Sequence, residues 1–237
     1  MLRRLESATG SYSSCVASAI NTLHEFQRAT EGTKMRKITA NLYMTLDGRG
    51  EFPKYPGSDI PSGNRDDPDE FFRKMWTDRY SDVTTVVMGR RSFTGHRRVH
   101  SLKGRKPNDP KFLFDYSRFL DRVDKVCLSH RLKRLDWENS RVLKGDLAKI
   151  IAKLKGEKGG NIIIEGGPRL IREVIRLNLA DDYWFLVMPV VFGRGLRYWD
   201  PMKTQTNLKL LSASSMPYGE LVLHYEAIHD KTASKSK

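Results

Sequence analysis

Apolar and polar residues alternate along residues 37–44 (KITANLYM). A period of two residues is typical of a β-strand with one face toward a core, so this segment is the first predicted strand. Asp47-Gly48 follows as a turn, and a Gly- and Pro-rich loop then runs to Asp67. A loop of that length in a compact domain is usually functional or mobile.

Helix signals recur farther along the chain. Asp67 suits a helix N-cap, with a proline and two acids in the first turn, and predicts a helix to about Tyr80. Gly145-Asp146 predicts a second helix start, because apolar residues then recur at helical spacings. Pro168 opens a third predicted helix.

The remaining apolar runs predict further strands. They lie at residues 83–88, 125–128, 141–143, 161–164, 183–191, 207–211 and 220–228, with a short helical stretch at 116–120. Strand and helix alternate from residue 36 to 191, and consecutive strands end the chain. This order is typical of a largely parallel sheet covered by helices, with an antiparallel C-terminal addition. The sequence therefore predicts an α/β fold in one domain.

Residues 1–34 differ in composition from the rest of the chain. They are rich in Ser and Ala with few periodic apolar positions, and predict an N-terminal appendage, disordered or with one short helix. Arg3, Arg4 and the serines resemble an organellar transit peptide, although the acids of this segment count against targeting. We expect the folded domain at 35–229 and a basic, disordered tail at 230–237.

The 237 residues include 42 Lys and Arg against 28 Asp and Glu, a formal charge of +14. Such a charge is compatible with a nucleic-acid partner, because Lys and Arg neutralise backbone phosphates. The densest basic segment, residues 95–106, carries no nucleic-acid-binding motif, so a solvated loop is favoured. His96 and His100 lie in this segment, where glycines argue against a helix, and are expected to be solvated rather than metal ligands.

Two further classes of protein are disfavoured. Cys15 and Cys127 are the only cysteines and neither lies in a CxxC or Cys/His cluster, so we expect no metal site. The longest apolar runs are far shorter than the roughly 20 residues of a membrane span. We therefore expect a cytoplasmic protein in a reducing compartment, with no membrane partner.

Three strand ends carry residues suited to phosphate binding. Gly89-Arg90-Arg91-Ser92 combines two guanidinium groups and a hydroxyl with the backbone N–H groups that a helix beginning there would leave free. Glu165-Gly166-Gly167-Pro168 allows a ligand to approach the backbone closely. Ser129-His130-Arg131 offers groups that suit a ribose phosphate. Each is also compatible with an ordinary turn, and neither a full Gly-x-Gly-x-x-Gly fingerprint nor a P-loop is present.

In their order along the chain, these motifs resemble the dihydrofolate reductase-like superfamily and, within it, the RibD C-terminal domain group. The resemblance rests on TLDG at 45–48, a helix over 69–74 followed by MGRRSF at 88–93, LSHR at 128–131, IIIEGGP at 162–168, LADDY at 179–183 and PVVFGRG at 189–195. It covers residues 36–228 and is far more specific in combination than any single motif.

The resemblance implies a three-layer α/β/α fold and NADPH-dependent hydride transfer to a small heterocycle, of the pterin (dihydrofolate) or ribosylaminopyrimidine type used in riboflavin biosynthesis. Asp47 and Asp69 are the implied catalytic candidates. The implied cofactor-binding residues are Ala40, Thr45, Gly48, Gly89, Arg90, Arg91, Ser92, Ser129, Arg131, Glu165, Gly166 and Gly167. A homodimer is also implied.

Two alternatives stay open. Residues 95–109 lack the DxPxLTxR segment with which RibD reductases hold their substrate, so a non-catalytic NADP(H)-binding protein is the first. A basic nucleic-acid-binding protein is the second and less favoured one, and it requires steeply salt-dependent affinity.

Overall fold

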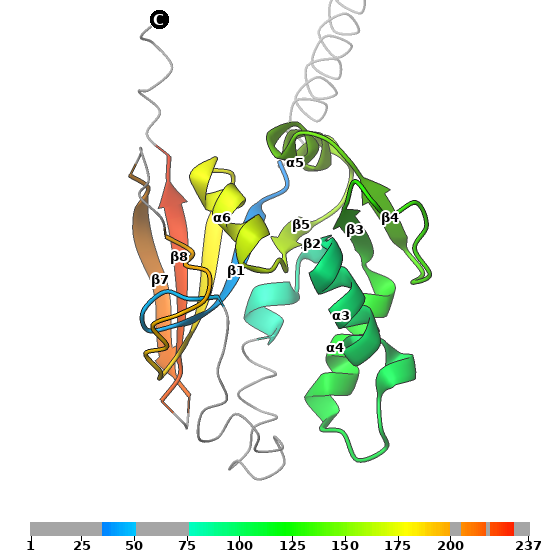
Figure 1. The fold of residues 1–237 in the computed structure, drawn as a ribbon, viewed down its shortest axis with the longest axis horizontal. Coiled ribbons are helices and arrows are strands. Elements are labelled where there is room, and N and C mark those ends of the chain that lie inside the picture. The colour runs from blue at the N-terminus through cyan, green and yellow to red at the C-terminus, as the bar shows by residue number, and fades with distance from the viewer. Residues whose placement is uncertain (1–34, 51–75, 200–204, 217–218, 230–237) are drawn as a thin grey trace, which may run out of the picture. The chain divides into compact units, whose positions relative to one another are not determined.

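The computed structural model describes residues 35–50, 76–199, 205–216 and 219–229 (Figure 1). Asp69 and the predicted helix start at Asp67 lie outside these residues, and so do the N-terminal segment 1–34 and the tail 230–237. Those expectations stay predictions. Residues 76–80 are helical, which agrees with the predicted end of that helix at Tyr80.

Eight strands form one sheet in the order β4-β3-β2-β5-β1-β6-β8-β7 within the described part of the chain. The strands are β1 (Ile38–Thr45), β2 (Val83–Gly89), β3 (Asp124–Leu128), β4 (Ser140–Leu143), β5 (Asn161–Ile164), β6 (Asp182–Met188), β7 (Asn207–Ser215) and β8 (Leu221–Ile228). All neighbours from β4 to β6 pair in parallel, whereas β8 is antiparallel to β6 and β7 to β8. The predicted parallel sheet with an antiparallel C-terminal addition is confirmed.

Helices cover both faces of this sheet (Figure 1). The elements are α3 (Arg90–His100), the short 3-10 helix η2 (Leu102–Gly104), α4 (Lys111–Arg122), α5 (Leu147–Gly156) and α6 (Pro168–Arg176). Helices α5 and α6 pack with one side of β1, including Ile38, Ala40 and Leu42. Helices α3 and α4 pack on the other face, against β2 and β3. The three-layer α/β/α architecture is therefore confirmed.

The main local error of the sequence pattern concerns residues 95–106. The structure continues α3 through Gly95 to His100, where a basic loop was predicted. An interior glycine costs a helix about 1 kcal/mol relative to alanine, but burial of Phe93 anchors this helix on the sheet. Helix α4 is likewise longer than predicted, because Tyr116, Phe119 and Leu120 all face the core.

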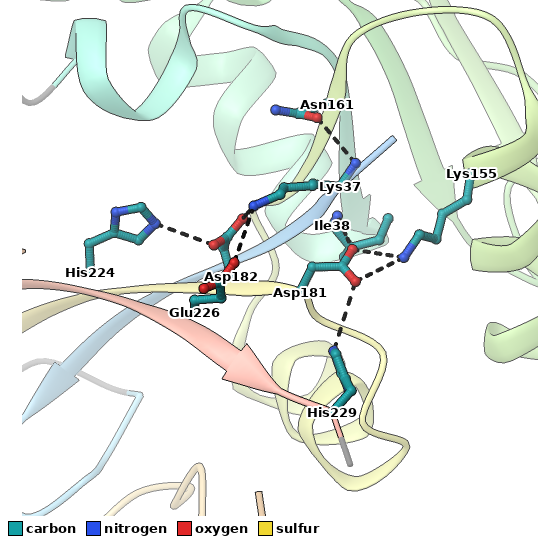
Figure 2. Close-up of polar contacts among 9 residues, drawn as sticks. All are labelled: Lys37, Ile38, Lys155, Asn161, Asp181, Asp182, His224, Glu226 and His229. Atoms are coloured by element: carbon teal, nitrogen blue, oxygen red, sulfur yellow. Dashed lines mark hydrogen bonds and ion pairs between the residues drawn. The ribbon is translucent and has the colours of Figure 1, made fainter. Parts of the chain in front are cut away.

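The amino edge of the parallel strands is closed by charged side chains (Figure 2). The carboxylate of Asp181 accepts hydrogen bonds from the backbone N–H of Ile38 at 2.7 Å and from Lys155 Nζ at 2.7 Å. Asp182 forms an ion pair with Lys37 at 3.5 Å. This network ties β1, β6 and α5 together and leaves the carboxyl edge as the place for a ligand.

Candidate active site

Most of the predicted site residues lie along one edge of the sheet. The parallel strands β1, β2, β3, β5 and β6 all run in the same direction, so the segments that follow them meet at their carboxyl ends. In the order of the sheet, this edge carries residues 129–131, 89–92, 165–167 and 45–48. Ligands of open α/β sheets bind at this edge. Ala40 differs from the others, because it lies inside β1 and is fully buried in the core.

Two helices begin side by side at this edge. Gly89 is the N-cap of α3 and Gly167 the N-cap of α6, and neither helix has a side-chain cap or an acid in its first turn. A Cβ on Gly167 would lie 3.4 Å from Ser92 Oγ, so the two first turns are neighbours. Free N–H groups and the positive ends of two helix dipoles thus converge, which favours an anion such as phosphate.

The backbone does not require glycine at either N-cap. Gly89 has φ −74° and Gly167 has φ −68°, both ordinary values for any residue. Among the described residues, no heavy atom lies within 4 Å of the position that a Cβ on Gly89 would take. Among the described residues, only Ser92 Oγ lies next to the two N-cap positions, which lets a phosphate group approach the backbone N–H groups of both helices.

Three arginines lie on this edge of the sheet. Arg90 and Arg91, in the first turn of α3, are exposed, and so is Arg131 beyond β3. Ser129 is buried, and its Oγ accepts hydrogen bonds from the backbone N–H groups of Arg131 and Leu132 at 3.2 and 3.1 Å. The Ser129 hydroxyl therefore shapes the turn, while the guanidinium group of Arg131 is available to a ligand.

Asp47 holds two loops together at the other end of the edge. Its carboxylate accepts hydrogen bonds from Thr45 Oγ1 at 2.7 Å and from Arg49 Nε at 3.1 Å. It also accepts from the backbone N–H groups of Phe192 at 3.0 Å and Gly193 at 2.9 Å, in the loop after β6. The Phe192 N–H, the Thr45 hydroxyl and the other donors hold the pKa of Asp47 well below its usual range. A carboxylate held in this way is a poor proton donor, so the geometry favours a positioning role over the predicted catalytic one.

A cavity of about 330 Å³ opens beside the helix starts, on the sheet face that carries α3 and α4. Its lining is mostly aromatic and consists of Tyr43, Trp76, Tyr80, Ser92, His96, His100, Phe112, Leu113, Tyr116, Glu165 and Gly166. The rings of Trp76 and Tyr80 stack at 4.4 Å. Flat aromatic walls with a few polar groups are typical of sites for small planar ligands.

One end of the cavity is acidic. Glu165 follows β5, is 5% exposed, and its Oε1 accepts hydrogen bonds from Asn41 Nδ2 at 2.9 Å and from the Tyr80 hydroxyl. Arg79 Nη1 in turn donates to Asn41 Oδ1 at 2.9 Å. Burial, and then the charge of Glu165, raise the pKa of Tyr80 well above its usual value, so its hydroxyl stays a donor to the carboxylate. The sequence predicted Glu165 at the cofactor, whereas the structure also places it in this cavity.

The two histidines of α3 were missed as site residues. Both His96 and His100 line the cavity, and their ring centroids are 5.3 Å apart. Their spacing of four residues was the available signal, but it has meaning only on a helix. Within the described ranges, no His, Cys, Asp and Glu side chains group in threes or more to hold a metal ion, and no helix has the length and apolarity to cross a membrane.

Comparisons with known proteins identify relatives of this chain. The model of the RibD C-terminal domain family matches residues 36–222. The uncharacterized protein YyaP of Bacillus subtilis (strain 168) is 27% identical over 205 residues, which cover 83% of this chain and 98% of YyaP.

Two solved structures have a similar fold. A putative riboflavin biosynthesis protein from Shewanella sp. PV-4 superposes with a TM-score of 0.55 at 16% identity, over 81% of this chain and 99% of the other. Dihydrofolate reductase from Enterococcus faecalis, complexed with NADP(H), superposes with a TM-score of 0.50 at 15% identity, over 81% and 97% of the two chains. At these identities the likeness is one of fold, and it agrees with the predicted three-layer α/β/α architecture.

Proposed function

The chain belongs to the RibD C-terminal domain family, and from that premise we propose that it is an NADPH-dependent reductase that transfers a hydride to a small heterocycle. The observation that carries the proposal is that Ser92 and Gly166 belong both to the carboxyl edge and to the lining of the aromatic cavity. A dinucleotide on the edge and a heterocycle in the cavity would therefore touch. Hydride transfer requires such contact between the two ligands.

The edge suits the cofactor. Arg90, Arg91 and the paired helix ends would hold its phosphates, and Arg131 would select the 2′-phosphate that distinguishes NADPH from NADH. Thr45, the last residue of β1, and Gly48, beyond this strand, would border the nicotinamide. When bound, NADPH supplies the hydride, so the protein has to hold, orient and shield the reactants.

The cavity suits the acceptor. Trp76 and Tyr116, whose rings meet edge-on, would give a planar ring an aromatic wall. The carboxylate of Glu165 would accept hydrogen bonds from the N–H groups of that ring. The Asn41 and Tyr80 bonds fix that carboxylate in place. Asp47 acts here as a positioning residue for the loop after β6, and Asp69 stays the candidate for the proton donor.

A binding titration tests the proposal. Purified protein is titrated with NADPH and with NADH by nicotinamide fluorescence, alongside Arg90→Ala, Arg131→Ala and the control Arg118→Ala, whose exposed side chain pairs with Asp115 on α4. We expect tighter binding of NADPH than NADH, weaker binding in both site variants and, for Arg131→Ala, loss of the preference. Absence of binding to either nucleotide would overturn the reductase proposal.

Turnover separates the reductase from a binding protein. NADPH oxidation is then followed with dihydropterins and aminopyrimidines, each free and ribosylated. Selective oxidation with one class supports the reductase. Cofactor binding without oxidation across the whole panel would favour a non-catalytic NADP(H)-binding protein instead.

A homodimer is the assembly that we propose. The edge strand β7 exposes Leu210 and Leu211 by 51% and 44%, and Lys209 is its one charged residue. In a protein of charge +14, a nearly uncharged strand is a surface where two copies can meet with little repulsion. Sedimentation of the native protein and of Leu210→Lys distinguishes a dimer through β7 from a monomer.

A further inference from the structure

The positive charge of the protein is concentrated in one part of the fold. Residues 89–144 contain 16 Lys and Arg against 6 Asp and Glu, a net charge of +10 in a chain whose total is +14. They form α3, η2, α4 and the strands β3 and β4, which lie together at one end of the sheet (Figure 1). The longer remainder of the chain carries only +4. This end of the sheet therefore has a strongly positive potential.

Part of this charge lies along the carboxyl edge, beyond the residues proposed to touch the cofactor. Lys133 and Arg134 come shortly after Arg131 in the segment that follows β3, and Lys144 follows β4 directly. Because β3 and β4 are parallel neighbours, these residues extend the edge outward from the helix ends. An anion that approaches the helix ends from this side passes along a row of positive charges.

The cations of this row are not held in place by the protein. Lys133, Arg134 and Lys144 are exposed, and none of their side chains forms an ion pair or a hydrogen bond within the residues that the structure describes. Fixing a flexible side chain on a ligand costs rotamer entropy, whereas its long-range field acts from every rotamer. These residues can therefore attract an anion from a distance without contacting it.

We propose that Lys133, Arg134 and Lys144 steer NADPH to the helix ends by long-range attraction and so set its association rate. This inference rests on the reductase function proposed above and adds to it a kinetic part of the preference for NADPH. NADPH carries one phosphate group more than NADH, which adds about −1.5 to −2 charges, so the positive edge draws it in faster. Electrostatic steering raises association rates by about 10- to 1000-fold at low ionic strength.

The dependence on salt distinguishes steering from contact. The Debye length is about 30 Å at 0.01 M salt and about 3 Å at 1 M, so the field of a distant charge is screened as salt is added. A residue that acts through its field changes the association rate, and only at low salt. A charged residue that touches the bound cofactor changes the dissociation rate as well.

The experiment is stopped-flow mixing of the protein with NADPH and with NADH, followed by nicotinamide fluorescence from about 0.01 to about 0.5 M NaCl. The edge variant Lys133→Gln/Lys144→Gln removes one charge after β3 and one after β4. The matched control Lys153→Gln/Lys158→Gln removes two exposed charges from the end of α5 and the turn that leads to the amino end of β5.

A variant of the opposite sign excludes general damage to the protein. Asp146 is the exposed N-cap of α5, close to Lys144, and its carboxylate accepts a hydrogen bond from the backbone N–H of Lys149 at 2.9 Å. Asparagine is an equally good N-cap, so Asp146→Asn keeps the cap and removes the negative charge. NADPH should then associate about twofold faster at low salt.

We expect Lys133→Gln/Lys144→Gln to lower the association rate of NADPH about 3- to 10-fold at 0.01 M salt, with a smaller loss for NADH and none at 0.5 M salt. Its dissociation rate, and both rates of the α5 control, should stay within about twofold of the native values. An unchanged association rate at low salt, or an equal rise of the dissociation rate, overturns the inference while the NADPH site stands. Failure of the native protein to bind NADPH would overturn the reductase function as well.

Discussion

A methyl group at either N-cap glycine is predicted to block the cofactor without disturbing the fold. Gly89→Ala and Gly167→Ala each add one Cβ where the backbone angles are ordinary. Within the described part of the chain, the new carbon has no neighbour within 4 Å at Gly89, and at Gly167 its one neighbour is Ser92 Oγ at 3.4 Å. The added atom therefore competes with a ligand and not with the protein.

The two expected magnitudes differ clearly. Alanine is a poorer N-cap than glycine by about 0.5–1 kcal/mol. Alanine also lowers the conformational entropy of the unfolded chain, which stabilises the protein by about 0.4–1 kcal/mol. The free energy of unfolding therefore changes by less than about 1 kcal/mol. A displaced phosphate loses at least one charge-assisted hydrogen bond to a backbone N–H, worth about 1.5–3 kcal/mol. Cofactor affinity should therefore fall roughly 10- to 100-fold.

The assay pairs NADPH titration with urea unfolding. Gly95→Ala is the matched control, because its Cβ also meets nothing within 4 Å but lies inside α3, behind the helix start. We expect that control to bind NADPH normally and to gain about 1 kcal/mol of stability, as alanine does in a helix interior. Normal NADPH affinity in both Gly89→Ala and Gly167→Ala would refute the assignment of the phosphates to these helix ends.

Three further predictions concern single residues. Asp47→Ala should raise the Kd for NADPH while leaving the far-ultraviolet circular dichroism unchanged. Because the pKa of Asp47 is held low, the native protein should still bind NADPH at pH 4. An unchanged Kd in the variant would exclude the positioning role. Lys125 is fully buried, and burial lowers its pKa from 10.5 to about 8, so the cost of its charge to stability is largest below pH 8. Between pH 8 and 10.5, the free energy of unfolding of the native protein should therefore rise by about 3 kcal/mol relative to that of Lys125→Met. Urea-unfolding profiles that stay parallel over this pH range would contradict the prediction. Gly160→Ala places a Cβ 2.1 Å from the carbonyl oxygen of Asp82 and should destabilise the fold by about 1–3 kcal/mol in urea unfolding. Gly156→Ala is the control, because its Cβ has no neighbour within 4 Å among the described residues. Equal stability of the two variants would show that the strand ends yield easily.

The central strands of the sheet were predictable because they are almost wholly buried. The runs NIII of β5 and DYWFLVM of β6 are apolar on both faces of the sheet, which is typical of a buried strand. The alternation along β1 places Ala40 on the face covered by α6 and Asn41 on the face of the cavity. The carboxyl-edge residues followed from their place after these strands. Parallel strands bring such segments together whatever lies between them in sequence.

Helix α3 was harder to predict because its evidence is tertiary. Only Phe93 is buried among its residues, and most of the others are Arg, His or Gly, so composition alone indicates a solvated loop. Packing on β2 and α4 overrides that composition. The same error hid His96 and His100, since only a helix turns both rings to one side.

The amino ends of the parallel strands carry contacts that stabilise the fold, whereas their carboxyl ends carry the candidate site. At the amino edge, Asp181 and Asp182 bind Lys155, Lys37 and a backbone N–H, so these buried or half-buried charges are compensated within the protein. At the carboxyl edge, Arg90 and Arg131 are exposed, and neither α3 nor α6 has a side-chain cap at its start. A protein gains nothing in stability from converging positive charge without a partner. Because the fold could cap these helices with a single Ser or Asp and has glycine instead, the open edge is best explained by an anionic ligand that completes it.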